Sequence, residues 1–104
     1  MIDPAKVRRE SIRWYILLAL NNARPIDTHE AVVLSTIQGI YPDITPMELR
    51  RELDYLADRQ LITLDRQPAG VWVAGLTSLG VDIAEYTVEC RAGIARPERY
   101  WGGA

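Results

Sequence analysis

The chain has 104 residues, 48% of them hydrophobic and 25% charged, which suits one domain and excludes global disorder. The formal net charge of −2 argues against strong non-specific affinity for nucleic acid, because proteins with that property are usually basic. Charge is unevenly spread, however: residues 1–24 and 91–104 sum to +3 and +2, whereas residues 25–90 sum to −7.

The cysteine content and the apolar runs indicate the compartment. Cys90 is the single cysteine, so no internal disulfide can form, and a reducing environment fits. The apolar stretch at residues 14–20 is too short to span a bilayer. We therefore expect a cytoplasmic protein with no membrane partner.

A first helix is predicted from Asp3, which can serve as N-cap, and Pro4, which suits the first helical position. It should run to about residue 22. Two apolar stripes at helical spacing indicate burial on two sides, one against the core and the other against the last helix or a second subunit. The stripes are Ile12, Tyr15, Ile16, Ala19 and Leu20, and Trp14, Leu17 and Leu18.

A basic cluster, Arg8, Arg9 and Arg13, lies on the same helix. It could hold an anionic partner. We favour the simpler interpretation, a solvated helix end.

A break at residues 24–26 precedes a second helix. Asp27 and Glu30 have the spacing of a capping box, which predicts a helix from residue 28 to about residue 40. Pro42 ends this helix before it and starts a turn. The expected apolar positions of the helix are Val32, Val33, Ile37 and Ile40.

The third helix has the strongest signals in the chain. Thr45 and Glu48 form a second capping box, in which the hydroxyl should accept from the Glu48 amide and the carboxylate should reach back to the cap. Pro46 fits the first helical position. Leucines then follow at i, i+4 and i+7, on one face. They are Leu49, Leu53 and Leu56.

A β-hairpin should follow, with strands at residues 61–65 and 71–73 around a turn at residues 67–70. Thr77 can then cap a last helix from residue 78 to about residue 92, with Gly93 as its stop. Residues 94–104 are predicted to be an irregular tail that carries Tyr100 and Trp101. We expect Leu49, Leu53, Leu56, Leu61 and Leu76 to be buried together, with Val71 or Val73 beside them.

These elements predict a mostly α fold with a small β-hairpin (α+β): a winged helix-turn-helix at residues 1–93 in the order helix, helix, helix, strand, strand, helix. The stretch LRRELDYLADRQLI, the hairpin and GLTSLG resemble the common bacterial winged-helix core, although Gln60 stands where a Gly often ends the recognition helix. The whole chain, especially VDIAEYTVECRAGIARPERYW, resembles small phage and prophage proteins of the Mu-like group, whose function is not assigned.

The winged-helix resemblance implies a DNA-reading helix and wing. Arg50 and Arg51 could contact guanine edges or phosphates in the major groove. The alternative is intrahelical pairing, because Asp54 lies at i+4 from Arg50 and i+3 from Arg51, and the acids of this helix outnumber its arginines. For Arg66 and Gln67 the alternative is an ordinary polar turn. The candidate DNA-contacting residues are Pro46, Met47, Arg50, Arg51, Asp54, Arg66 and Gln67.

Two functions remain open. The first is a DNA-binding transcriptional regulator of phage or prophage, expected to be a homodimer because the terminal helices carry more apolar surface than one small core needs. The second is a phage-derived protein-protein interaction module with little or no DNA binding. The candidate dimer interface is Trp14, Leu17, Leu18, Leu79, Ile83 and Tyr86.

Catalysis is not expected. His29 is the single histidine, and no serine or cysteine motif accompanies it. The spacing of Cys90 and His29 fits no zinc site, and there is no phosphate-binding glycine loop. We predict no enzyme activity, no metal and no cofactor.

Overall fold

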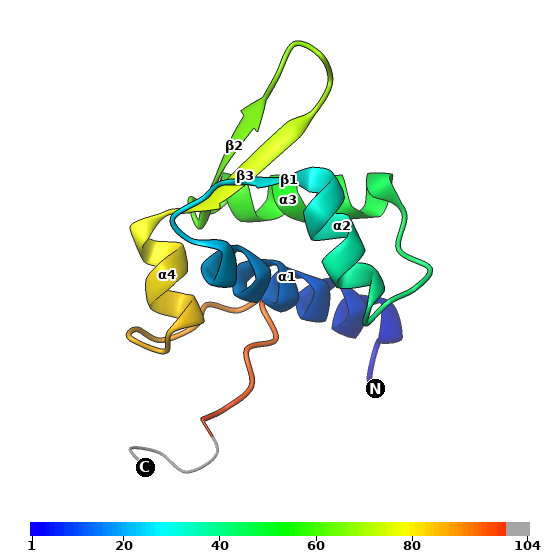
Figure 1. Ribbon diagram of the computed structural model, residues 1–104. Helices are drawn as coiled ribbons and strands as arrows, with labels where there is room; N and C mark the ends of the chain where they lie inside the picture. The colour runs from blue at the N-terminus through cyan, green and yellow to red at the C-terminus, as the bar shows by residue number, and fades with distance from the viewer. Residues whose placement is uncertain (100–104) are drawn as a thin grey trace.

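Four helices and a three-stranded sheet make up residues 1–99, the part of the chain that the computed structural model describes. Figure 1 shows α1 running beneath α2 and α3, with α4 at its left and the β2–β3 hairpin projecting at the top. The elements are α1 (Pro4–Ala23), β1 (Thr28–His29), α2 (Glu30–Gln38), α3 (Pro46–Asp58), β2 (Ile62–Arg66), β3 (Trp72–Leu76) and α4 (Ser78–Ala84).

The sheet has the strand order β1-β3-β2 and is antiparallel throughout. β2 and β3 pair from Ile62 opposite Leu76 to Arg66 opposite Trp72. β1 adds two residues on the other side of β3, with Thr28 opposite Ala74. This short strand was missed from the sequence, but the predicted α+β class is confirmed, and the order of helices and hairpin is that of a winged helix-turn-helix.

Helix α2 corrects the prediction for residues 28–40. Thr28 and His29 are extended because they pair with β3, so the helix begins at Glu30. Its N-cap is His29, whose Nδ1 accepts from the Ala31 amide at 3.0 Å, and not Asp27. Of the four apolar positions of this helix, Val33 and Ile37 are buried, whereas Val32 and Ile40 are 57% and 44% exposed.

Three other helix starts follow the sequence. The Asp3 carboxylate accepts from the Ala5 amide at 3.0 Å, the Thr45 hydroxyl from the Glu48 amide at 3.1 Å, and the Thr77 hydroxyl from the Gly80 amide at 3.1 Å. These caps satisfy amides that a helix leaves unpaired at its first turn.

The last helix is shorter than predicted, ending at Ala84 instead of about residue 92. Tyr86 has φ +62, a left-handed conformation that cannot continue a helix. The following segment packs back on the domain: Arg96 donates to the carbonyls of Ile83 and Val88 at 3.1 and 2.8 Å. Ile94, in the segment predicted as tail, is 8% exposed and part of the core.

The core lies between α1, α3 and the sheet. The four leucines of α3 and its C-terminal junction are 0–1% exposed, which confirms the predicted leucine face. Leu76, which we predicted to be buried, is half-buried, as are Val71 and Val73, and the buried residues of β3 are Ala74 and Gly75. Other large core residues come from α1 and the α2–α3 region: Ile12, Trp14, Ile16, Leu17, Leu20, Val33, Ile37 and Ile44.

The junction of α3 with β2 fixes where the β2–β3 hairpin (residues 62–76), which we call the wing, starts. Gln60 has φ +63, so it adopts the conformation for which glycine is favoured at a helix end. The Leu61 amide then donates to the Leu56 carbonyl at 3.0 Å, and the Leu61 carbonyl accepts from the Thr77 amide at 3.1 Å. A Cβ at Gly80 would overlap that Leu61 carbonyl oxygen. Gly80 therefore permits α4 to approach the junction closely.

Candidate nucleic-acid interface

Helix α3 has a buried side and an open side. Leu49, Leu53 and Leu56 face the core, while Met47 is 72% exposed. Arg51, Asp54 and Asp58 are also exposed. We call Met47, Arg51, Asp54 and Asp58 the outer face of α3. Pro46, at the first turn, is exposed as well.

Arg50, a predicted DNA contact, is engaged inside the domain. Its guanidinium donates two hydrogen bonds to the Glu30 carboxylate, at 2.7 and 2.6 Å, and one to the Gly70 carbonyl at 2.6 Å. It also lies 4.4 Å from the centre of the Trp72 ring. The same Glu30 carboxylate accepts from the Trp72 amide at 2.7 Å. Arg50 thus joins α2, α3 and the wing.

The Arg50–Glu30 pair is held in its ionised form. Arg50 lowers the pKa of Glu30, and the Trp72 amide lowers it further. Glu30 in turn raises the pKa of Arg50. Two parallel hydrogen bonds to a carboxylate are the strongest geometry open to an arginine. The half-buried pair therefore acts as a fixed brace.

A second brace joins the wing to α3. Arg66 of β2 forms an ion pair with Asp54 and lies 4.7 Å from the centre of the Trp72 ring. Both side chains are 51% exposed. The predicted pairing of Asp54 within its own helix is therefore wrong: its partner is the wing arginine. Gln67 is exposed at the hairpin turn, where its backbone amide donates to the Val71 carbonyl at 2.9 Å.

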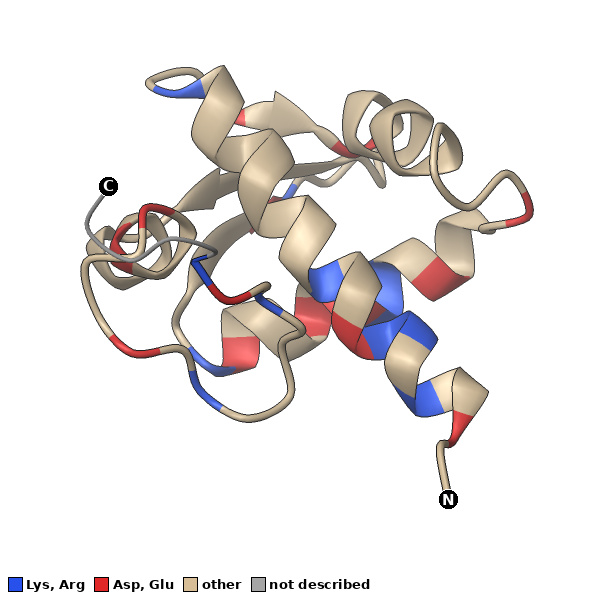
Figure 2. Cartoon of the chain, turned by 90° about the horizontal axis from the view of Figure 1, so that it is seen from below, with Lys and Arg blue, Asp and Glu red and all other residues tan. Residues whose placement is uncertain are grey.

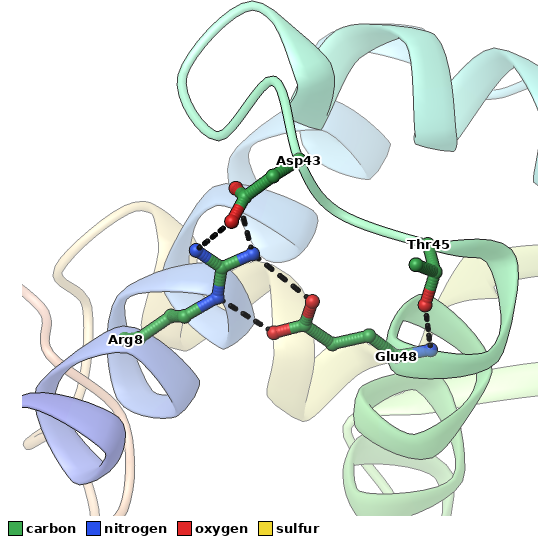
Figure 3. Close-up of polar contacts among 4 residues, drawn as sticks. All are labelled: Arg8, Asp43, Thr45 and Glu48. Carbon is green, nitrogen blue, oxygen red and sulfur yellow. Dashed lines mark hydrogen bonds and ion pairs between the residues drawn. The ribbon is translucent and has the colours of Figure 1, made fainter.

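Glu48 faces α1 instead of the α3 cap. Arg8 donates to its carboxylate at 2.7 and 3.0 Å and pairs with Asp43 at 3.0 Å (Figure 3). Glu48 and Asp43 both raise the pKa of Arg8. The predicted reach of the Glu48 carboxylate back to the cap is thus wrong, because Arg8 offers an opposite charge and a cap amide does not. Thr45 supplies its half of the capping box.

Glu52, one turn further along α3, is buried. Its side chain is 2% exposed, and it accepts from Arg13 at 2.7 Å. Arg13, 11% exposed, also donates to the Gly93 carbonyl at 2.9 Å and lies 3.4 Å from the centre of the Tyr55 ring. The interpretation of Arg8 and Arg13 as a solvated helix end is therefore wrong.

Sequence reasoning missed this α1–α3 contact, although it left a signal. Glu48 and Glu52 are four residues apart and lie on the same side of α3. Arg8 and Arg13 of α1 are spaced so that each can reach one of them. Two of the acids that we counted against DNA binding thus point away from the outer face of α3. Asp54 is paired with Arg66, which leaves Asp58 beside Arg59 at 3.8 Å.

Some cations remain without a carboxylate partner within residues 1–99. They include Lys6 and Arg9 of α1 and Arg51 of α3, all exposed. Figure 2 shows basic positions gathered on the N-terminal half of α1. Among the helices, positive charge free to meet an anion is thus found at the start of α1 and on the adjoining outer face of α3; Arg91 and Arg99, after α4, are exposed as well.

The residues proposed for a dimer interface lie mostly inside one chain. Trp14 is 5% exposed, and Leu17 and Ile83 are 0% exposed. Trp14 packs edge-on against Tyr86, with ring centroids 5.8 Å apart. Leu18, Leu79 and Tyr86 are half-buried against the same core. The apolar excess that motivated the homodimer is thus covered by α1–α4 packing, and the homodimer stays a prediction. Tyr100 and Trp101 lie outside the described residues.

His29 and Cys90 are the residues that the sequence offered for catalysis or metal binding. The His29 imidazole caps α2. Burial raises the pKa of the Cys90 thiol, which disfavours the reactive thiolate. Within residues 1–99, no group of three or more His, Cys, Asp or Glu side chains is arranged to hold a metal ion. Nor does that stretch contain a helix long and apolar enough to cross a membrane. Comparisons with protein-family models, curated proteins and solved structures find no match for this chain.

Proposed function

We propose that this domain binds double-stranded DNA through the outer face of α3 and the wing, as a transcriptional regulator of phage or prophage. One observation carries the proposal: the described chain leaves the outer face uncovered, while the Arg66–Asp54 ion pair and the hydrogen bonds of Arg50 and Glu30 to Gly70 and Trp72 hold the wing beside it. In this docking mode α3 enters the major groove and the wing lies along the adjacent backbone. The phage assignment rests on sequence resemblance.

The braces support this function through pre-organisation. A hairpin that is already fixed loses less conformational freedom when it meets a partner, so more of the contact energy appears as affinity. On this proposal Arg50 and Arg66 are positioning residues that orient the wing. Arg51 is the arginine of α3 that is available for a phosphate or a base edge.

A second candidate, a protein-protein interaction module, is favoured by a different observation. A mostly apolar groove of about 260 Å³ runs between α2 and α3, and Met47 is exposed near it. Such a groove suits an apolar side chain of a partner protein better than a phosphate. Its lining is His29, Glu30, Ala31, Leu34, Pro46 and Leu49.

A mobility-shift titration with random and phage-derived duplexes separates the two candidates. DNA binding predicts a shift at low salt and an affinity that falls steeply as salt rises. Asp58→Ala removes a carboxylate from the outer face and should tighten binding, whereas Arg51→Ala should weaken it. Absence of any shift at low salt would retire the DNA proposal and leave the interaction module. Opposite effects of the two variants are expected only if this face meets the anionic backbone.

A further inference from the structure

A groove of about 340 Å³ lies between the start of α1 and the start of α3. It adjoins the outer face of α3, because Met47 and Arg51 belong to both surfaces. The charged side chains that line it are Arg8 and Arg9 from α1 and Glu48, Arg51 and Glu52 from α3.

The ion pairs described above divide these charges into two sets. Arg8 and Glu48 neutralise each other, and the Glu52 carboxylate is turned to Arg13. Arg9 and Arg51 have no carboxylate partner within residues 1–99, and both are exposed. The groove is therefore lined by paired charges and by two unpaired guanidinium groups, one from each helix.

We infer that Arg9 and Arg51 hold a backbone phosphate of duplex DNA at this groove, an inference that rests on the proposed DNA binding. A guanidinium group matches a phosphate with two parallel hydrogen bonds and gives up its hydration more readily than an ammonium group. Because this groove adjoins the outer face of α3, a duplex that receives α3 in its major groove would bring a backbone strand next to the start of α1. Phosphate contacts of this kind set the register of the protein on the duplex and carry no sequence information.

The test is the salt dependence of duplex binding by the full chain. Arg9→Ala and Arg51→Ala should each weaken binding to all sequences, and each should reduce the slope of log affinity against log salt by up to about 0.9, the value for one phosphate contact. Arg24→Ala is the matched control. It removes the same charge from the far end of α1, where Arg24 pairs with Glu85 on the surface at 3.1 Å, and should leave the slope unchanged.

The outcomes separate the inference from the proposed function. If the wild-type chain binds and Arg9→Ala behaves like Arg24→Ala, the phosphate site is wrong while DNA binding stands. If the wild-type chain gives no shift at low salt, DNA binding fails and the inference fails with it. The last experiment adds polyglutamate to the protein–DNA complex. If polyglutamate displaces DNA at an equal concentration of negative charge, the groove binds an acidic polypeptide and the inference is overturned. Unchanged far-ultraviolet circular dichroism of each variant shows that the fold is intact.

Discussion

The two sides of α3 carry the same kind of contact in different surroundings. On the α1 side, Arg13 and Glu52 are 11% and 2% exposed. On the wing side, Arg66 and Asp54 are each 51% exposed. Water screens the Arg66–Asp54 pair, so the attraction between its charges is weak. The Arg13–Glu52 pair is shielded from water, so each charge depends on the other for its stabilisation.

This difference in burial gives the two ion pairs different roles: the buried pair stabilises the fold, and the exposed pair positions the wing. Removing one member of the buried pair leaves a charge in the interior, so this contact should control stability. Removing one member of the exposed pair returns the other to water, so this contact should control only where the wing lies. The Arg50–Glu30 pair, at 36% and 14% exposed, falls between them.

The largest effect is expected from the buried pair. Glu52→Ala should destabilise the fold by on the order of 3–5 kcal/mol, because it leaves the Arg13 charge uncompensated. Urea unfolding measures this. The control is Glu48→Ala, one turn earlier and 23% exposed, which should cost less, about 1–2 kcal/mol. Equal losses of unfolding free energy in the two variants would show that burial does not decide how much each ion pair stabilises the fold.

An intermediate effect is expected at Glu30, which accepts from Arg50 and from the Trp72 amide. Glu30→Gln should cost about 1–2 kcal/mol at neutral pH, and its cost should depend on pH. The pKa of Glu30 is lowered in the folded state, so the unfolded chain takes up the proton first as pH falls. The stabilisation is then full above the ordinary carboxyl pKa and is lost as pH falls through the lowered one.

Unfolding free energies measured from neutral to acid pH check this sign. The gap between wild type and Glu30→Gln should narrow below the ordinary carboxyl pKa. Glu85→Gln, which alters an exposed pair, should give a small gap at every pH. A Glu30 gap that widened on acidification would contradict the prediction.

The smallest effect on stability is expected from the exposed brace. Arg66→Ala should change the unfolding free energy by less than about 1 kcal/mol, while the end of the wing becomes more mobile. Faster amide exchange at Gln67 and Gly70, which hydrogen-bond within the turn, would report that mobility. If Arg66→Ala lost as much stability as Glu52→Ala, the Arg66–Asp54 pair would stabilise the fold and not merely position the wing.

Local signals in the sequence were sufficient for most of the secondary structure. Asp3, Thr45 and Thr77 cap helices as predicted, because a cap is decided by residues within one turn. The end of α4 and the start of α2 could not be predicted in this way. Thr28 and His29 follow a helix-start signal but are drawn into β1 by β3, more than forty residues later in the chain.

The candidate site was less predictable than the fold. The seven candidate DNA-contacting residues lie on α3 and at the wing, but the roles of Arg50 and Arg66 depend on partners in other elements. The sequence did not distinguish Arg9 from Arg8 and Arg13. They differ in their partners on α3: Arg8 pairs with Glu48 and Arg13 with Glu52, whereas Arg9 meets no carboxylate within residues 1–99. Charge counting by segment overlooked that Glu48 and Glu52 are turned toward α1.

The sequence by itself determined the winged-helix order, the leucine face of α3 and three helix caps, because these depend on periodicity and on hydrogen bonds between near neighbours. The tertiary structure decided which charges meet: Glu30 with Arg50, Asp54 with Arg66, Glu48 with Arg8 and Glu52 with Arg13. The physical reason is that an ion pair depends on the distance and burial of two groups in space. Neither quantity exists until the helices have packed.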